Sequence, residues 1–598
     1  MKKLMISVVV FVAFFLVSTL AFGQEAPVLL KAMQDELARS VDKLKLENEE
    51  APYFISYLIK DCQMLEIVAN SGAVTRNDEN RFRKLDVDVR VGNYDLDNSH
   101  FQSFQNMGFS MRMFGGRAEV TLEDNYDVLR RELWLETDRA YKDALETFTK
   151  KKAYLQNTIR SDSLPDFTRE EKLSNMKLPA AFDAKRDLLS RTVGDISRLF
   201  LGNDKIQKST VALKRSIENT YYVNSEGAVY VEPHVASRLS ISATAQAEDG
   251  MPLKDFLVYA FADVDGMPAV ETLKKDVEAM MRELAALRNA PVAEDYSGPV
   301  LFAGQAAAEI LAQGFVDNLV AERTSASDNA QFNMFSGKRE NPFLSKAELP
   351  VTAKSISVKA QPTLKNYGGA ALLGSYEVDD EGVRTQDVSL IENGILKNFM
   401  MSRSPVKGFN KSNGHFRGTS AAPSVVRLSS SEASPYGALK DRLIQEVKDD
   451  GLKYGYIIKS IIPLSEAKEL GDIDIQSMVM SMYTSSPTEI KLSRPVVVYR
   501  VYPDGKEELV RGAEFANLGI KCFKDIIGTS DDAFVYNYPI RSSEMPFDLG
   551  IFGISVPGSD YYASVITPAI IISEIDVNKS IGNYGKPPIV SYPSLVGK

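Results

Sequence analysis

The side chains best suited to metal binding and proton transfer near neutral pH are the three histidines, His100, His234 and His415. None of them lies within five residues of another, so the chain carries no local zinc-peptidase motif of the His-Glu-x-x-His kind. His415 lies in a polar loop, Ser412–Gly418, between expected strands. Two interpretations stay open for it: contact with a substrate or metal, or a local hydrogen bond within the loop. For His100 and His234 we expect surface or structural positions.

Two further groups of residues have metal-binding chemistry without the matching spacing. The acidic run Asp379–Gly382 offers carboxylate oxygens, which Ca²⁺ prefers, yet it lacks the spaced ligands of a calcium loop. We therefore expect a solvated turn that opens a strand. Cys62 and Cys522 are too few for a structural zinc site. We expect two unpaired, mostly buried thiols, with a disulfide between them as the alternative. Neither a G-x-S-x-G elbow nor a P-loop occurs in the sequence.

Two segments would position the remaining candidate residues. The stretch Gly298–Asp317 predicts a short buried strand, a small-residue turn and a helix that carries Ala312, Gln313 and Asp317. Asn393 and Gly394 separate two short apolar runs, and Asn-Gly is a strong signal for a two-residue hairpin. With His415, this hairpin tip gives the candidate substrate contacts.

The length of the chain sets its domain organisation. A chain of 598 residues is too long for one hydrophobic core, so several domains are expected. We predict an α+β protein with a signal peptide at 1–23 and an N-terminal α+β domain at 24–117. A helical insertion and middle domain follow at 118–290, and a strand-rich C-terminal domain at 291–598. Within the insertion, residues 118–215 are expected to be mostly helical.

The net charge and the N-terminal segment indicate which binding partners and which cellular location to expect. The net charge is −10 and there are no blocks of Lys and Arg, which argues against nucleic acid as a partner. Met1–Gly23 has the charged, apolar and small-residue order of a secretory signal, so we expect a periplasmic or secreted protein. The alternative is an inner-membrane anchor through residues 4–22, the length of a bilayer span. No other contact with a membrane is expected.

Several of these segments together resemble the TldD/PmbA family, also called TldD/TldE or modulator-of-gyrase proteins. The resemblance is strongest from Gly298 to Asp532. It includes the acidic turn at Asp379–Gly382, the hairpin Ile391–Leu396, the loop at Ser412–His415 and the segment Gly512–Phe515. The N-terminal half matches more loosely, and the helical block 118–215 looks like an enlargement.

The resemblance implies a two-subunit peptidase for extended peptides. One subunit binds zinc through His-Glu-x-x-x-His and a Cys near the C-terminus, and the other lacks these ligands. When this chain is aligned with the motif that it resembles, the first His falls on Ala312, the general-base Glu on Gln313 and the second His on Asp317. The Cys would fall within Gly553–Ile570, which contains none. Alanine cannot coordinate a metal, and glutamine cannot accept a proton from metal-bound water.

We therefore expect a TldE-like member that is not itself catalytic and binds no cofactor. Zinc is expected only in a partner subunit. The partner is a metal-bearing paralogue or a second copy of the chain. The first alternative is a stand-alone exported binding or assembly protein on the same scaffold. The second is a hydrolase with a non-standard metal site formed by Glu309, Asp317 and His415.

Overall fold

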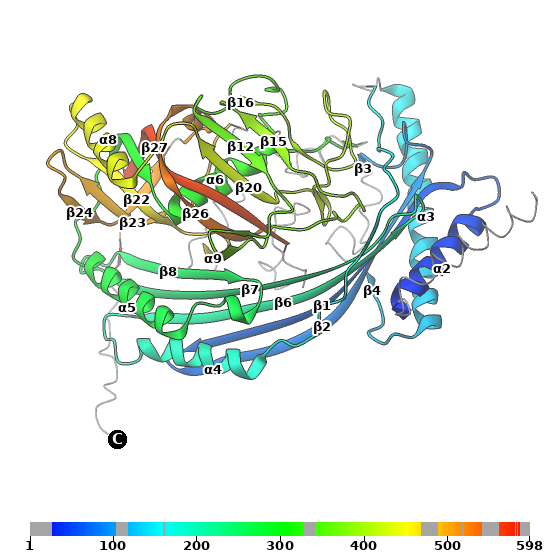
Figure 1. The fold of residues 1–598 in the computed structure, drawn as a ribbon, viewed down its shortest axis with the longest axis horizontal. Coiled ribbons are helices and arrows are strands. Elements are labelled where there is room, and N and C mark those ends of the chain that lie inside the picture. Colours follow the sequence, from blue (N-terminus) through cyan, green and yellow to red (C-terminus); the bar gives the residue numbers. More distant parts are fainter. Residues whose placement is uncertain are drawn as a thin grey trace, which may run out of the picture.

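Two β-sheets, one from each half of the chain, lie as stacked layers in the computed structural model (Figure 1). The structure describes residues 27–102, 118–158, 163–327, 341–467, 488–516, 518–540, 561–580, 582 and 584–585. The expected signal peptide at 1–23 lies outside these residues. Helices cover the outer face of the first sheet and both faces of the second, so the predicted α+β class is confirmed.

The first sheet has seven strands among the described residues, in the order β4-β2-β1-β6-β7-β5, with β8 paired to β7. They are β1 (Pro52–Asn70), β2 (Ala73–Val91), β4 (Ala118–Glu119), β5 (Ser174–Met176), β6 (Lys208–Asn224), β7 (Val229–Gln246) and β8 (Pro252–Phe261). β1 and β6 pair continuously from Ser56↔Asn224 to Ala69↔Val211. The boundary predicted at 117/118 is therefore wrong as a division between domains, because strands from both sides of it form one sheet.

The four helices of the N-terminal half are α2 (Val28–Lys43), α3 (Tyr126–Asn157), α4 (Arg186–Ser197) and α5 (Val270–Leu287). α2 and α3 pack on one end of the sheet, where Leu133 and Tyr141 are buried against Ile59. α4 and α5 pack on the other end, over Val211 and Ile241. Residues 118–215 are thus helical mainly in α3 and α4, and their last residues belong to β6, so the predicted helical block is too long.

The second sheet has twelve strands among the described residues and contains β9 and β27 at its centre. Its longer strands are β9 (Tyr296–Phe302), β12 (Ile356–Ala360), β15 (Val388–Glu392), β20 (Val425–Ser430), β22 (Gly455–Ile461), β23 (Pro495–Val501), β24 (Glu507–Val510), β25 (Ala513–Ala516), β26 (Ile526–Ile540) and β27 (Tyr561–Lys579). The two-residue strands β16 (Ile395–Leu396) and β21 (Ala433–Ser434) complete it.

Two helices lie on opposite faces of this sheet, and this explains its apolar sequence. Val300 and Phe302 point to the core that contains α6 (Gln305–Gly314), and Leu301 points to α8 (Tyr436–Asp449). A strand that is covered on both faces needs a continuous apolar run. The predicted strand and helix at Gly298–Asp317 are therefore present, with α6 continued by the 3₁₀ turn η5 (Val316–Leu319).

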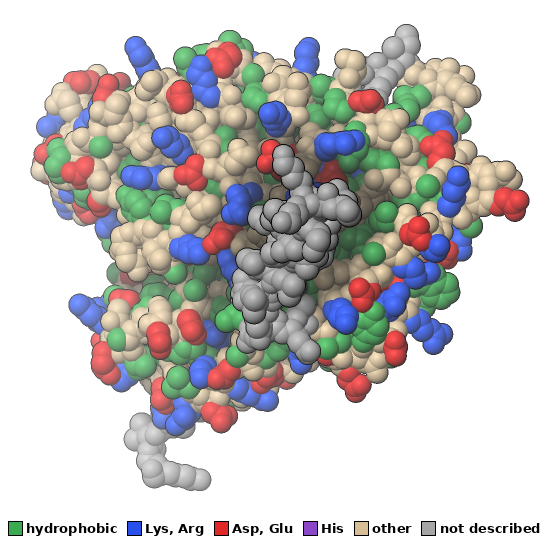
Figure 2. All heavy atoms as spheres, turned by 45° about the vertical axis from the view of Figure 1, so that its right-hand side comes forward, with side chains coloured by type: hydrophobic (Ala, Val, Ile, Leu, Met, Phe, Trp, Pro, Cys, Tyr) green, Lys and Arg blue, Asp and Glu red, His purple; other side chains and the backbone are tan. Residues whose placement is uncertain are grey.

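The surface seen in Figure 2 carries charged side chains of both signs in alternation. Among the described residues on that face there is no large basic stripe of the kind that follows a phosphate backbone. Of the helices in the described ranges, none combines the length and apolarity that a bilayer crossing needs. Cys62 and Cys522 are both buried and unpaired, as expected.

Candidate functional site

The helix α6 is placed by a sharp turn and by small side chains. Gly304 precedes the helix with φ of 55°, a conformation that residues with a Cβ rarely adopt. Ala306, Ala307 and Ala308 are fully buried, so the helix lies directly on β22, β26 and β27. The turn at Gly304 and the small side chains after it therefore place α6, with Ala312 and Gln313, against the sheet.

Glu309 is the central side chain of this site, and it is 2% exposed. The Gln313 amide donates from Nε2 to Glu309 Oε2 at 2.7 Å, and the Tyr536 hydroxyl of β26 donates to Oε1. Burial raises the pKa of the Glu309 carboxyl to about 7, although the hydrogen bonds from Tyr536 and Gln313 act in the opposite direction. Glu309 is thus a buried carboxyl that changes charge near neutral pH.

Gln313 has both of its amide atoms engaged. Besides Glu309, its Nε2 donates to the Ile462 carbonyl at 3.1 Å, and its Oε1 accepts from the Ser493 backbone N–H at 2.9 Å. These backbone partners fix which amide atom is nitrogen and which is oxygen. The side chain works as a bridge between α6, residue 462 and residue 493, and it has no proton-accepting atom to offer a water.

The other two motif positions do not supply metal ligands either. Ala312 is almost buried and carries only a methyl group, and Asp317 is an exposed residue of η5. Within the described parts of the chain, no three side chains of His, Cys, Asp or Glu are grouped so that they could hold a metal ion. The residues at this position therefore do not fit the zinc site that the resemblance describes.

Arg238 brings the first sheet to this site. Its guanidinium forms an ion pair with Glu466 and donates to the Ser465 hydroxyl at 2.7 Å, while Ser240 donates to Glu466 at 3.0 Å. The positive charge of Arg238 also lowers the pKa of Glu309, the smallest of the effects on that group. The two sheets thus meet beside α6, a juxtaposition that sequence spacing could not show because 228 residues separate Arg238 from Glu466.

His415 is fully buried. Its Nδ1 lies 2.8 Å from Asn413 Oδ1 and 3.0 Å from the Asn413 carbonyl, and its Nε2 lies 3.1 Å from the Ser424 hydroxyl. Two acceptors face Nδ1, so the neutral ring donates there and accepts from Ser424 through Nε2. Burial lowers its pKa to about 4, which keeps the ring neutral at pH 7. Of the two interpretations, the local hydrogen bond is the one that the structure displays.

The hairpin tip is also bonded locally. Asn393 has a positive φ of 48° and Gly394 one of 82°, as the Asn-Gly signal predicted. The Gly394 backbone pairs with Ile356 and Val351. None of the hydrogen bonds described for Asn393, Gly394 or His415 joins the network around Glu309. The predicted substrate contacts are therefore not assembled with α6.

The acidic turn is buried, which corrects the expectation of a solvated turn. Asp379 accepts from three backbone N–H groups, those of Glu381 (3.0 Å), Val383 (2.9 Å) and Phe416 (3.1 Å). Glu381 accepts from the Arg403 backbone N–H at 2.7 Å. These bonds hold the turn against the loop that contains His415.

Asp380 connects this turn to the first sheet. Its Oδ2 lies 3.4 Å from the Lys60 ammonium and accepts from Tyr561 at 2.6 Å. Lys60 also lies 3.0 Å from Glu218, and Lys60 and Glu218 are both buried. Although burial opposes it, the pair of carboxylates raises the pKa of Lys60, and Lys60 in turn lowers the pKa of Glu218 to about 2. A buried ionic cluster therefore joins the two halves of the chain, and the polar sequence of the turn gave no sign of it.

Part of the chain resembles known proteins in sequence. Residues 295–579 match the family profile of the PmbA/TldA metallopeptidase C-terminal domain. A segment of 99 residues is 29% identical to a metalloprotease from Archaeoglobus fulgidus, and covers 17% of this chain and 22% of that protein. The match thus spans about a fifth of that relative's length.

Two solved structures share the fold over most of the chain. TldE from Thermococcus kodakarensis is 14% identical with a TM-score of 0.55, and the comparison covers 92% of this chain and 100% of that one. A structure described as a modulator of a DNA gyrase, from Thermotoga maritima, is 14% identical with a TM-score of 0.56, over 92% of this chain and 99% of that one. At these identities the likeness is one of fold.

Proposed function

The chain belongs to the TldD/PmbA family, and from this premise we propose that it is the non-catalytic, TldE-like subunit of an exported two-subunit metallopeptidase that acts on extended peptides. The observation that carries the proposal is the set of side chains on α6. Ala312 has no donor atom, and Gln313 uses both amide atoms in bonds to Glu309, Ile462 and Ser493. A metal ion would find no ligand at residue 312, and a metal-bound water would find no general base at residue 313.

The surroundings of α6 favour a supporting role rather than chemistry. Gln313 and Tyr536 each donate a hydrogen bond to Glu309, so both carboxyl oxygens of Glu309 are already occupied. Arg238 and Glu466 neutralise each other beside them. In this proposal the subunit contributes walls and binding surface to a chamber, and the partner contributes the zinc and the water that attacks the peptide bond.

The experiment begins with the purified mature chain. We expect no stoichiometric zinc by elemental analysis and no cleavage of unstructured peptides by the chain alone. Affinity purification from the native host is expected to recover a homologue that carries His-Glu-x-x-x-His, and the mixture is expected to cleave. One zinc per chain together with activity of the isolated subunit would refute the proposal.

Export rests on the N-terminal segment. The mass of the mature protein distinguishes the two outcomes left open by the sequence: a new N-terminus at Gln24 supports the signal peptide, and a retained Met1–Phe22 supports the membrane anchor.

A stand-alone binding or assembly protein remains the second candidate, favoured by the fact that the α6 network is complete without a metal. It predicts that the chain purifies from its host without a metal-bearing homologue. The third candidate, a metal site from Glu309, Asp317 and His415, lacks support, since His415 is bonded within its own loop.

A further inference from the structure

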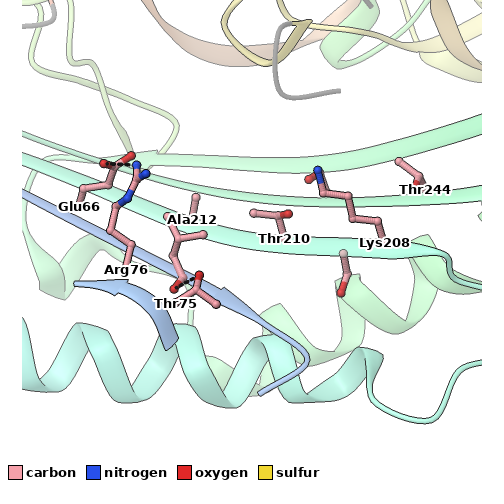
Figure 3. Close-up of a pocket in the computed structure, with 10 residues that line it drawn as sticks. Glu66, Thr75, Arg76, Lys208, Thr210, Ala212 and Thr244 are labelled. Atoms are coloured by element: carbon pink, nitrogen blue, oxygen red, sulfur yellow. Dashed lines mark hydrogen bonds and ion pairs between the residues drawn. The ribbon is translucent and has the colours of Figure 1, made fainter. Parts of the chain in front are cut away.

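A polar groove lies on the first sheet, on the face opposite to α4 and α5. It has a volume of about 430 Å³ and is lined by residues of β1, β2, β6 and β7 (Figure 3). In β6 and β7 the buried positions Val211 and Ile241 pack under the helices, so their neighbours Thr210 and Ser242 point the other way. Figure 3 shows Glu66 and Arg76 meeting on the side of the strands away from the helices.

The chemistry of the lining selects a polar, anionic ligand. No aromatic residue lines the groove, so there is no platform for stacking a base or a sugar. Arg76 is neutralised by Glu66 at 2.9 Å. The exposed Lys208 has no anionic partner within the described part of the chain, and the groove therefore carries one uncompensated positive charge.

Hydroxyl groups surround that charge in a regular grid. Lys208 lies directly opposite Thr244, and Thr210 lies directly opposite Ser242, and these are successive cross-strand pairs on the same face of the sheet. The hydroxyls of Thr210, Ser242 and Thr244 have no hydrogen-bond partner among the described residues, so they can donate to a carboxylate held by Lys208 or bond to a peptide backbone.

The groove lies on the same face of β7 as the contacts to α9 (Leu464–Ala467), and it ends where Ser240 and Arg238 are buried under that helix. Along the same face of β7, Ser242 is followed by Ser240 and Arg238, which both contact Glu466. Successive same-face residues of a strand are about 7 Å apart, so Ser242 and Arg238 are separated by roughly 14 Å. An extended peptide rises by about 3.4 Å per residue, so about four residues of peptide span that distance.

Resting on the function proposed above, we propose that this groove binds the carboxylate side chains of an extended peptide on the part of the sheet that α9 leaves open, roughly 14 Å from Arg238 along β7. Lys208 supplies the charge, and Thr210, Ser242 and Thr244 supply the hydroxyl donors. The groove would thereby give the chamber a preference for acidic peptides.

The test measures binding of fluorescein-labelled eight-residue peptides to the full chain by anisotropy, at two salt concentrations. One peptide contains two Glu residues and its counterpart has Gln in their place. We expect the Glu peptide to bind more tightly, with the difference shrinking as salt rises. Lys208→Ala should weaken it about two- to fivefold, the effect of one exposed ion pair, and Lys208→Glu more strongly. Lys275→Ala, an exposed lysine of α5 on the other side of the sheet, should change nothing.

The outcomes separate this inference from the proposed function. Peptide binding that is independent of Lys208, or equal for the Glu and Gln peptides, overturns the groove and leaves the two-subunit peptidase standing. Inhibition of binding by free glutamate or phosphate at the concentration of the peptide overturns the peptide part and assigns the groove to a small anion. If neither peptide binds to the chain, alone or with its metal-bearing partner, both proposals fail.

Discussion

Replacing Glu309 by Gln should make the folded protein more stable at alkaline pH. The carboxyl has a folded-state pKa of about 7, against an ordinary value of 4.5, because it is buried. A folded pKa above the unfolded one means that folding takes up a proton between these values, so stability falls as pH rises from 4.5 to 7. The difference of about 2.5 pKa units corresponds to roughly 3 kcal/mol lost at pH 8.

Glutamine is the right probe because it resembles the protonated acid. Its amide nitrogen can donate toward Tyr536, and its oxygen can accept from Gln313, whose orientation is fixed by Ile462 and Ser493. Glu309→Gln should therefore match the wild type near pH 4.5 and exceed it by roughly 3 kcal/mol at pH 8.

The assay is urea unfolding followed by circular dichroism at half-unit pH steps from 4.5 to 8.5. The exposed Glu392→Gln serves as the matched control and should run parallel to the wild type throughout. If the curves of Glu309→Gln and the wild type are parallel as well, Glu309 is not a buried acid that titrates near neutrality, and our account of the α6 network is wrong.

Two other substitutions probe the remaining buried groups. Lys60→Met removes the cation between Asp380 and Glu218 and should destabilise the protein by about 3–5 kcal/mol in thermal or urea unfolding, because two buried carboxylates lose their partner. Lys214→Met replaces an exposed lysine of β6 and should cost far less. His415→Gln should flatten the acid limb of the stability curve: burial lowers the histidine pKa to about 4, so stability is lost as pH falls from 6.5 through 4, by up to roughly 3 kcal/mol. An unchanged acid limb would show that the ring is not held neutral.

Local sequence signals predicted the elements whose residues face one core. The spacing of Leu273, Val277, Met280 and Leu284 predicts a helix over 270–287, and α5 has these limits, since its apolar stripe packs on one side only. The turn at Asn224–Gly227 separates β6 from β7, and Asn393-Gly394 separates β15 from β16, because positive φ is needed there. In each case a few neighbouring residues determine the outcome.

Apolar sequence patterns underestimate the length of strands that have polar faces. The sequence pattern predicts two strands, at 53–59 and 64–69, whereas the structure has one strand over both, β1 (Pro52–Asn70). In β2 the half that contains Arg76, Asp78 and Asn80 has no apolar alternation, yet it pairs in register with β1. Its place in the sheet comes from backbone bonds to a neighbouring strand, and no local pattern records that pairing.

The site was predictable where it depended on α6 and unpredictable where it depended on distant partners. Ala312 and Gln313 were identified from one helix. Tyr536, Arg238 and Glu466 reach the same place from β26, β7 and the residues after β22, and they are at least 70 residues apart from one another in sequence. The acidic turn was misjudged for the same reason, because only the fold reveals that Lys60 lies against Asp380.

The helix α6 can keep its position without a metal because its anchoring is distributed over several neutral groups. Gln305 exchanges two hydrogen bonds of 2.9 Å with the backbone of Ile461, and Gln313 adds two more to the backbone of residues 462 and 493. Each such bond contributes about 1 kcal/mol net, so none is indispensable, whereas a catalytic zinc site depends on every one of its three protein ligands. Packing of the helix requires only small residues such as Ala307. The scaffold and the ligand positions are therefore under separate physical constraints, and residues 312, 313 and 317 can diverge while the fold around them stays intact.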